Sequence, residues 1–149
     1  MTTPIPSWVR WGTLVTLAVP QLITGVWAVL APHNWFENFP GLGPAIVSAD
    51  PPFNAHLATD AGAGFLATGI ALSAAAIWVR RDLFVLALTT FLAFSVPHVL
   101  FHIGHKAPGL SSLENARSVA MLATSVVLAL VFLWGVRPDR ATSSAPSTG

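Results

Sequence analysis

The histidines and a few carboxylates of this 149-residue sequence have types and spacings that could do chemistry. His98, His102 and His105 are spaced i, i+4 and i+7, so in a helix their imidazoles fall within a wedge of roughly 60° on one face. His56 and Asp60 are again one helical turn apart. Histidine is the commonest metal ligand in proteins, and it also changes charge near neutral pH. The two spacings therefore predict either metal binding or proton handling.

The metal hypothesis uses both groups together. Two helices that each present an i, i+4 pair of ligands are typical of metal sites in helical bundles. We predict His56, Asp60, His98 and His102 as the ligands, with His105 as a further ligand or a residue at the entrance. Asp60 and His105 are also the candidate catalytic residues. Iron, copper and zinc all fit such a set, and a b-type haem held by His56 and His102 is the alternative cofactor.

Two other hypotheses use the same residues without a metal. Ionisable groups inside a membrane are costly and often mark proton pathways, but no Lys or Glu continues such a pathway through the first and last apolar segments. In the structural hypothesis, the histidines and Asp60 hydrogen-bond one another and the carbonyl groups freed by Pro97. The protein would then be a non-enzymatic subunit of a membrane complex.

The elements that must position these residues are membrane spans. Hydrophobic residues make up 54% of the chain and charged residues only 9%, against about 25% charged in an average soluble domain. Four apolar segments are long enough to cross about 30 Å of hydrocarbon as helices. They cover residues 11–31, 57–79, 83–104 and 118–136. The sequence thus predicts an all-α integral membrane four-helix bundle, a single domain over residues 1–137, with a small polar tail over 138–149 that we expect to be disordered.

The cations indicate the orientation of this bundle. Most lie on the side that both termini share with the loop between the second and third segments: Arg10, Arg80, Arg81, Arg137 and Arg140. Only Lys106 and Arg117 lie on the other side. Because cytoplasmic loops carry an excess of cations, both termini are predicted to be cytoplasmic. His56 opens the second segment and His105 follows the third, so the site is predicted near the extracytoplasmic face.

Composition excludes several functional classes. A formal net charge of +1 gives no basic surface for nucleic acid. The absence of cysteine excludes disulfides, thiolate metal sites and iron–sulfur clusters. The partners that remain are the lipid bilayer, a lipophilic substrate or quinone, and a homo-oligomer or larger membrane complex. Small residues along the second segment would allow close helix approach in such an assembly.

Local signals mark the helix ends and the first loop. Asn54 has the character of an N-cap for the second helix, and Ser111 with Glu114 has the spacing of a capping box before the fourth. Pro and Gly over residues 39–44 and 50–52 favour turns. The aromatic and polar residues between the first two segments suit a loop that lies on the membrane surface.

Three motifs resemble those of a group of small four-helix membrane proteins from actinobacteria. They are Phe39-Pro40-Gly41, Asn54-x-His56-Leu57-x-x-Asp60-x-Gly62-Ala63 and Pro97-His98-x-x-Phe101-His102-x-x-His105. The resemblance covers the first three segments and most of the first loop. It supports the choice of the His and Asp residues without supplying a reaction, and it implies a location in the bacterial cytoplasmic membrane.

More distantly, the size and four-helix layout are similar to those of DoxX-like membrane proteins, some of which are associated with oxidoreductase systems. Fold alone does not imply function. For the predicted metal site we favour redox chemistry on a lipophilic substrate or quinone, so that the protein would be a metal-dependent membrane oxidoreductase.

Overall fold

The computed structural model describes residues 4–136, and all the elements it assigns there are helices. Their bounds are α1 Ser7–Gly12, η1 Thr13–Ala18, α2 Val19–Leu30, α3 Pro32–Asn38, α4 Ala55–Trp78, α5 Arg81–Gly104 and α6 Ser112–Gly135. The first three run on as one helix over Ser7–Leu30. That helix, α4, α5 and α6 are each 24 residues long and apolar enough to cross a membrane. The predicted all-helical architecture, with four helices long and apolar enough to cross a membrane, is confirmed, while the predicted disordered tail lies outside the described residues.

Two of these helices begin before the apolar segments because polar residues cap them. Ser111 Oγ accepts a hydrogen bond from the Glu114 backbone N–H at 3.3 Å, and the Glu114 carboxylate accepts one from the Ser111 N–H at 2.8 Å. Asn54 Oδ1 accepts the Leu57 N–H at 3.1 Å and caps α4. Both predicted caps are confirmed. The apolar segment predicted for the last helix begins at residue 118, whereas the helix itself begins six residues earlier, at Ser112.

Two features of the N-terminal half were not predicted. The chain turns at Ala31 and forms the short helix α3 where a loop was expected, with Pro32 at its first position. Proline suits this position because its missing N–H would have no helical partner there. The first span also changes to π-helical pairing over η1, directly before Pro20, which has no N–H to donate.

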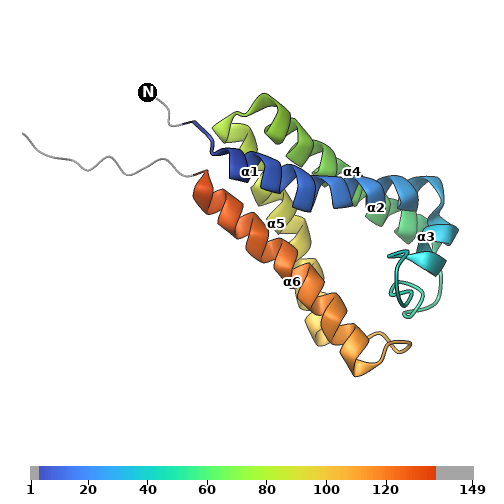
Figure 1. The fold of residues 1–149 in the computed structure, drawn as a ribbon. Coiled ribbons are helices and arrows are strands. Elements are labelled where there is room, and N and C mark those ends of the chain that lie inside the picture. Colours follow the sequence, from blue (N-terminus) through green and yellow to red (C-terminus); the bar gives the residue numbers. More distant parts are fainter. Residues whose placement is uncertain (1–3, 137–149) are drawn as a thin grey trace, which may run out of the picture.

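The spans pack mainly onto their neighbours in the sequence. α2 lies along α4, α4 contacts α5, and α5 lies along α6. In Figure 1 the α5–α6 pair and the α2–α4 pair lie close together near α1 and diverge toward α3. The two ends of the described chain meet at the closed end of the bundle, where Gly135 packs against Trp8 and Val9.

Glycines allow the close approach of α2 and α4. A Cβ on Gly62 would lie 2.8 Å from Ala28 Cβ and 2.9 Å from the Val29 backbone nitrogen. A Cβ on Gly25 would lie 2.5 Å from the Leu66 nitrogen. A real Cβ atom essentially never lies this close to another heavy atom, so the backbones of α2 and α4 meet at a distance that only glycine permits. This close packing is what small residues provide in lipid, where burial of apolar surface drives association little.

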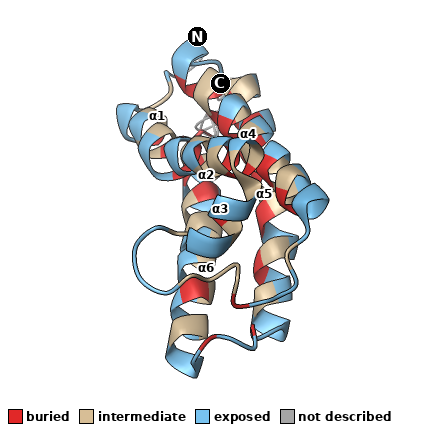
Figure 2. Cartoon of the chain, turned by 90° about the vertical axis from the view of Figure 1, so that its right-hand side faces the viewer, coloured by how far each residue is buried: buried red, intermediate tan, exposed pale blue. Residues whose placement is uncertain are grey.

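The main apolar core lies at the closed end of the bundle. Its buried residues are Val9, Leu17, Ala18, Leu72, Ala75, Ala76, Phe84, Ala87, Leu88, Phe91, Ala129, Phe132 and Val136. Figure 2 shows buried positions along the inward faces of the helices and exposed positions along their outward faces. The outward side chains are apolar, so in a membrane they contact lipid. The opposite end of the bundle, with α3 and the turn between α5 and α6, is called the open end. In the described residues only two small apolar clusters occur there.

Candidate functional site

His98 and His102 lie on one face of α5, as their spacing predicted, and His105 is the first residue after the helix end, with extended backbone. The ring centroids of His98 and His102 lie 4.7 Å apart with the rings almost perpendicular. The His105 ring stacks on Phe101 with 4.9 Å between ring centroids. His98 and His102 are partly buried, whereas His105 is exposed. We call these three residues the imidazole row.

The inner end of the imidazole row is closed by aromatic side chains. His98 stacks on Phe94 at 6.1 Å between ring centroids and meets the edge of Phe65 from α4 at 6.4 Å. Phe94 and the buried Phe91 continue the same face of α5 toward the main core. The row therefore begins at an apolar barrier and leads outward along the open end of the bundle.

The outer end of the row meets a carboxylate from the loop between α3 and α4. Asp50 Oδ2 lies 3.1 Å from His105 Nε2. The loop is held there because the Gly109 N–H donates to the Ala49 carbonyl at 2.9 Å. Ala49 is also buried against Ala107 in the turn between α5 and α6. Asp50 was not among the predicted site residues, because a loop without periodicity carries no signal for its place in the fold.

His56 and Asp60 pair with each other outside the row. Their side chains lie 3.3 Å apart and are 83% and 61% exposed. Phe65 marks the side of α4 that faces α5, because its ring meets His98. At 3.6 residues per turn, Asp60 lies roughly 140° and His56 roughly 180° around the helix from Phe65. The two residues lie at the same end of the bundle as the row, but on a side of α4 that does not face it.

The predicted ligand set is therefore not assembled as one cluster. Within residues 4–136, no three His, Asp or Glu side chains lie together as a group that could hold a metal ion. The structure instead contains the imidazole row, the His105–Asp50 contact and the separate His56–Asp60 pair. Two imidazoles one turn apart are a minimal chelating pair, and a row of imidazoles ending at a carboxylate can also pass protons.

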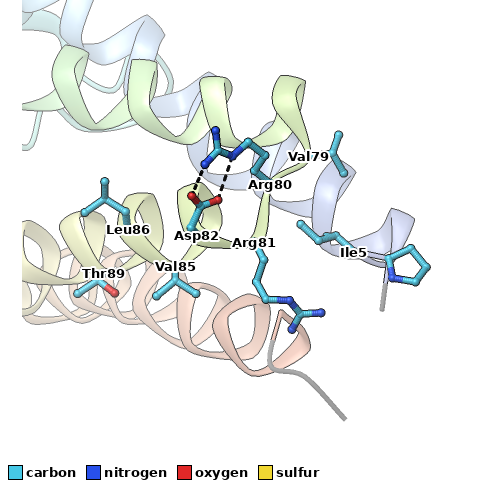
Figure 3. A pocket seen from close by; sticks show the side chains of 9 residues that line it. Ile5, Val79, Arg80, Arg81, Asp82, Val85, Leu86 and Thr89 are labelled. Carbon is cyan, nitrogen blue, oxygen red and sulfur yellow. Dashed lines mark hydrogen bonds and ion pairs between the residues drawn. The ribbon is translucent and has the colours of Figure 1, made fainter. Parts of the chain in front are cut away.

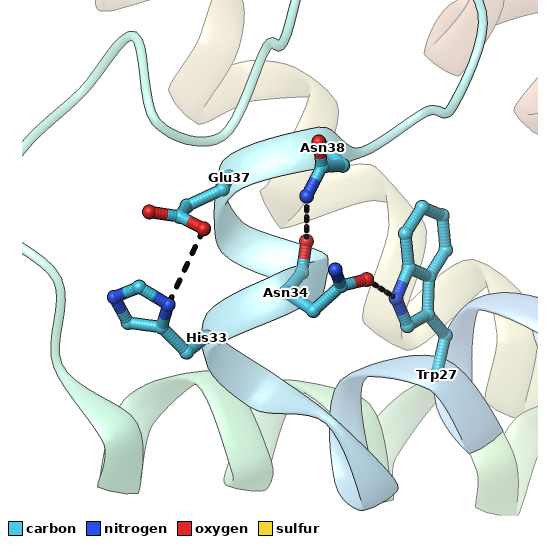
Figure 4. A network of polar contacts seen from close by, with 5 residues as sticks. All are labelled: Trp27, His33, Asn34, Glu37 and Asn38. Atoms are coloured by element: carbon cyan, nitrogen blue, oxygen red, sulfur yellow. Dashed lines mark hydrogen bonds and ion pairs between the residues drawn. The ribbon is translucent and has the colours of Figure 1, made fainter.

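The fifth histidine belongs to α3. His33 Nδ1 lies 3.3 Å from the Glu37 carboxylate, as Figure 4 shows. In the same network the Trp27 indole N–H donates to Asn34 Oδ1 at 2.8 Å, and Asn38 Nδ2 donates to the Asn34 carbonyl. The Trp27–Asn34 bond fastens α3 to the end of α2. His33 forms its ion pair within α3, on an exposed surface.

No protein-family model, curated protein or solved structure matches the chain. The resemblance to the actinobacterial group and to DoxX-like proteins therefore stays a prediction. What can be said of function depends on the residues and contacts described above.

Proposed function

We propose that the protein is an integral membrane protein that binds a transition metal through the imidazole row of α5. The observation that carries the proposal is the contact between His98 and His102, whose rings lie 4.7 Å apart on successive turns of one rigid helix. Two imidazoles held in this way can bind one metal ion after small rotations of their side chains. Iron, copper and zinc all accept imidazole ligands.

His105 and Asp50 extend this pair. A ligating histidine commonly donates its other ring N–H to a carboxylate, which fixes the ring and makes it a better ligand. Asp50 lies 3.1 Å from Nε2 of His105 and suits that outer role, which leaves Nδ1 of the ring for a metal. His56 and Asp60 face another direction, so we assign them no ligand role in this arrangement. A haem held by His56 and His102 is supported less, because His56 lies on the side of α4 that faces away from α5, the helix that carries His102.

The reaction we propose is redox chemistry on a lipophilic substrate or quinone. It is supported by the apolar surroundings of the inner row, where Phe65 and Phe94 pack against His98. We place the open end on the extracytoplasmic side and both termini in the cytoplasm, because Arg10, Arg80 and Arg81 belong to the opposite end.

Proton handling is the second candidate function. The order of His98, His102, His105 and Asp50 supports it, since neighbouring groups in such a row can exchange protons. The barrier formed by Phe94 and Phe91 limits the row to the outer half of the bundle. A half-channel that serves a partner subunit fits this geometry better than a complete path across the membrane.

The test is metal analysis of the protein purified in detergent through a tag that contains no histidine. We expect one iron, copper or zinc ion per chain, and loss of most of it in His98→Ala and His102→Ala. His33→Ala and His56→Ala are the matched controls, because each removes one imidazole outside the row, and both should retain the metal. Full occupancy in the two row variants would contradict the proposal. Loss in His56→Ala would restore the original ligand prediction.

An optical spectrum of the same preparation separates the remaining alternatives. A Soret band would show haem and would replace the mononuclear site. A folded, metal-free protein that conducts protons in liposomes, and loses this activity in His102→Ala, would favour the second candidate. A protein with neither property would support a structural role for the row.

A further inference from the structure

A groove lies at the closed end, away from the imidazole row. Its volume is about 980 Å³, and it is formed by the start of the chain, the α4–α5 turn and the first turns of α5. Figure 3 shows Arg80, Asp82, Leu86 and Val85 along this groove. Val85 and Leu86 are exposed on the outer face of α5, 43% and 64% respectively. The groove thus joins cationic groups to an apolar strip.

Charge at this end is predominantly positive. Arg10, Arg80 and Arg81 all belong to it, and Asp82 is the one carboxylate that the described part of the chain places there. Arg10 donates to the Ala76 carbonyl at 2.8 Å, and Arg81 donates to the Val136 carbonyl. The carbonyl contact leaves the positive charge of Arg10 in place. Within residues 4–136, three arginines and one aspartate belong to this end, a formal net charge of +2.

Arg80 is the cation that can exchange partners. Its guanidinium donates two hydrogen bonds to Asp82, at 3.1 and 2.5 Å. Asp82 accordingly raises the pKa of Arg80 above its ordinary value, so the group stays charged. Both side chains are about two-thirds exposed, 65% and 63%. An exposed pair of this kind is weak, and an anion of higher charge density can displace its carboxylate.

We propose that this groove binds an anionic phospholipid from the leaflet in which the closed end lies. The phosphate takes the Arg80 guanidinium at this net positive end, and an acyl chain lies along Val85 and Leu86. Charge complementarity identifies the occupant, because a zwitterionic lipid would gain little from a net positive end. The apolar strip identifies a lipid rather than free phosphate. This inference requires membrane insertion but not the metal site.

The test is native mass spectrometry of the full-length protein with dioleoyl phosphatidylglycerol and dioleoyl phosphatidylcholine. We expect the wild type to retain the anionic lipid preferentially. Arg80→Gln should weaken that retention about fivefold, the effect of removing one cation near an anionic surface. Asp82→Asn should strengthen retention, because it releases Arg80. Lys106→Gln is the matched control, since it removes one exposed cation from the opposite end of the bundle, and it should change nothing.

Equal retention of the two lipids by the wild type would overturn the proposal. So would equal losses in Arg80→Gln and Lys106→Gln, because the effect would then be one of overall charge. Displacement of the lipid by excess inorganic phosphate would indicate a free-anion site and would also overturn it. Metal content of the same variants should stay unchanged, so failure here is distinguishable from failure of the proposed metal site.

Discussion

The imidazole of His105 and the carboxylate of Asp50 lie 3.1 Å apart although 55 positions separate them in the chain. Their side chains are 46% and 41% exposed, so the pair itself contributes at most about 1 kcal/mol. The contact is maintained by the docking of Ala49 against Ala107 and Leu110. Packing in the loop, rather than the charges, therefore places a carboxylate at the end of the imidazole row.

This packing predicts that Gly109→Ala releases the loop. A Cβ on Gly109 would lie 2.9 Å from Ala49 Cα, so the loop must move away and the bond from the Gly109 N–H to the Ala49 carbonyl is lost. Hydrogen exchange followed by mass spectrometry should show faster exchange in residues 45–50. Gly104→Ala is the control, because nothing lies within 4 Å of its added Cβ. Unchanged protection in Gly109→Ala would contradict the docking.

Close packing of α2 on α4 predicts that Gly62→Ala destabilises the bundle by about 1–3 kcal/mol, the usual effect of overpacking. The new Cβ would meet Ala28 and the Val29 backbone, neither of which can turn aside. Gly64→Ala on the same helix would meet only the Phe94 ring at 3.2 Å, and this side chain can shift. Reversible unfolding in detergent should therefore separate the two variants. Equal midpoints would show that the helices do not meet at Gly62.

Val79, which follows the last residue of α4, is a position where a substitution should raise stability. Val79 has φ of 53° in the left-handed region, which a β-branched side chain adopts at a cost. Val79→Gly should raise stability by about 1 kcal/mol, because glycine adopts this conformation without strain. Val85→Gly within α5 should lower stability by a similar amount. A loss of stability in Val79→Gly would exclude the left-handed turn.

Orientation can be measured cleanly because the chain has no cysteine of its own. Asn38→Cys lies at the end of α3 and Ser7→Cys at the start of α1, and both positions are exposed. In intact cells a membrane-impermeant maleimide should label Asn38→Cys, and it should label Ser7→Cys only after lysis. The reverse pattern would place the imidazole row in the cytoplasm.

The spans and the imidazole row could be predicted from the sequence because both depend on local periodicity. Apolar length predicts a span, and the spacing of His98 and His102 determines their shared face whatever surrounds the helix. His105 was expected on that face, but the helix ends one residue before it. The capping residues Asn54 and Ser111 could be recognised for the same reason, since a cap acts within one helical turn.

What could not be predicted depends on how helices are rotated against one another. The spacing of His56 and Asp60 places them on one face of α4, but only packing decides which neighbour that face meets. Gly62 packs against α2 and Phe65 packs against α5, and both lie on other sides of α4 than His56 and Asp60. The position of Asp50 depends on a loop that tertiary contacts fix, and such contacts leave no local pattern in the sequence.

The order of packing also bears on how the protein is made. Each span after the first packs against the span that precedes it in the chain: α4 against the first helix, α5 against α4 and α6 against α5. A polypeptide that enters the bilayer from its N-terminus can therefore assemble as it is synthesised, because every new helix meets a partner already in place. Only the final contacts of α6 with α1 and η1 must wait for the last span. The closed end of the bundle is thus completed last, when the Val136 carbonyl accepts the hydrogen bond from Arg81.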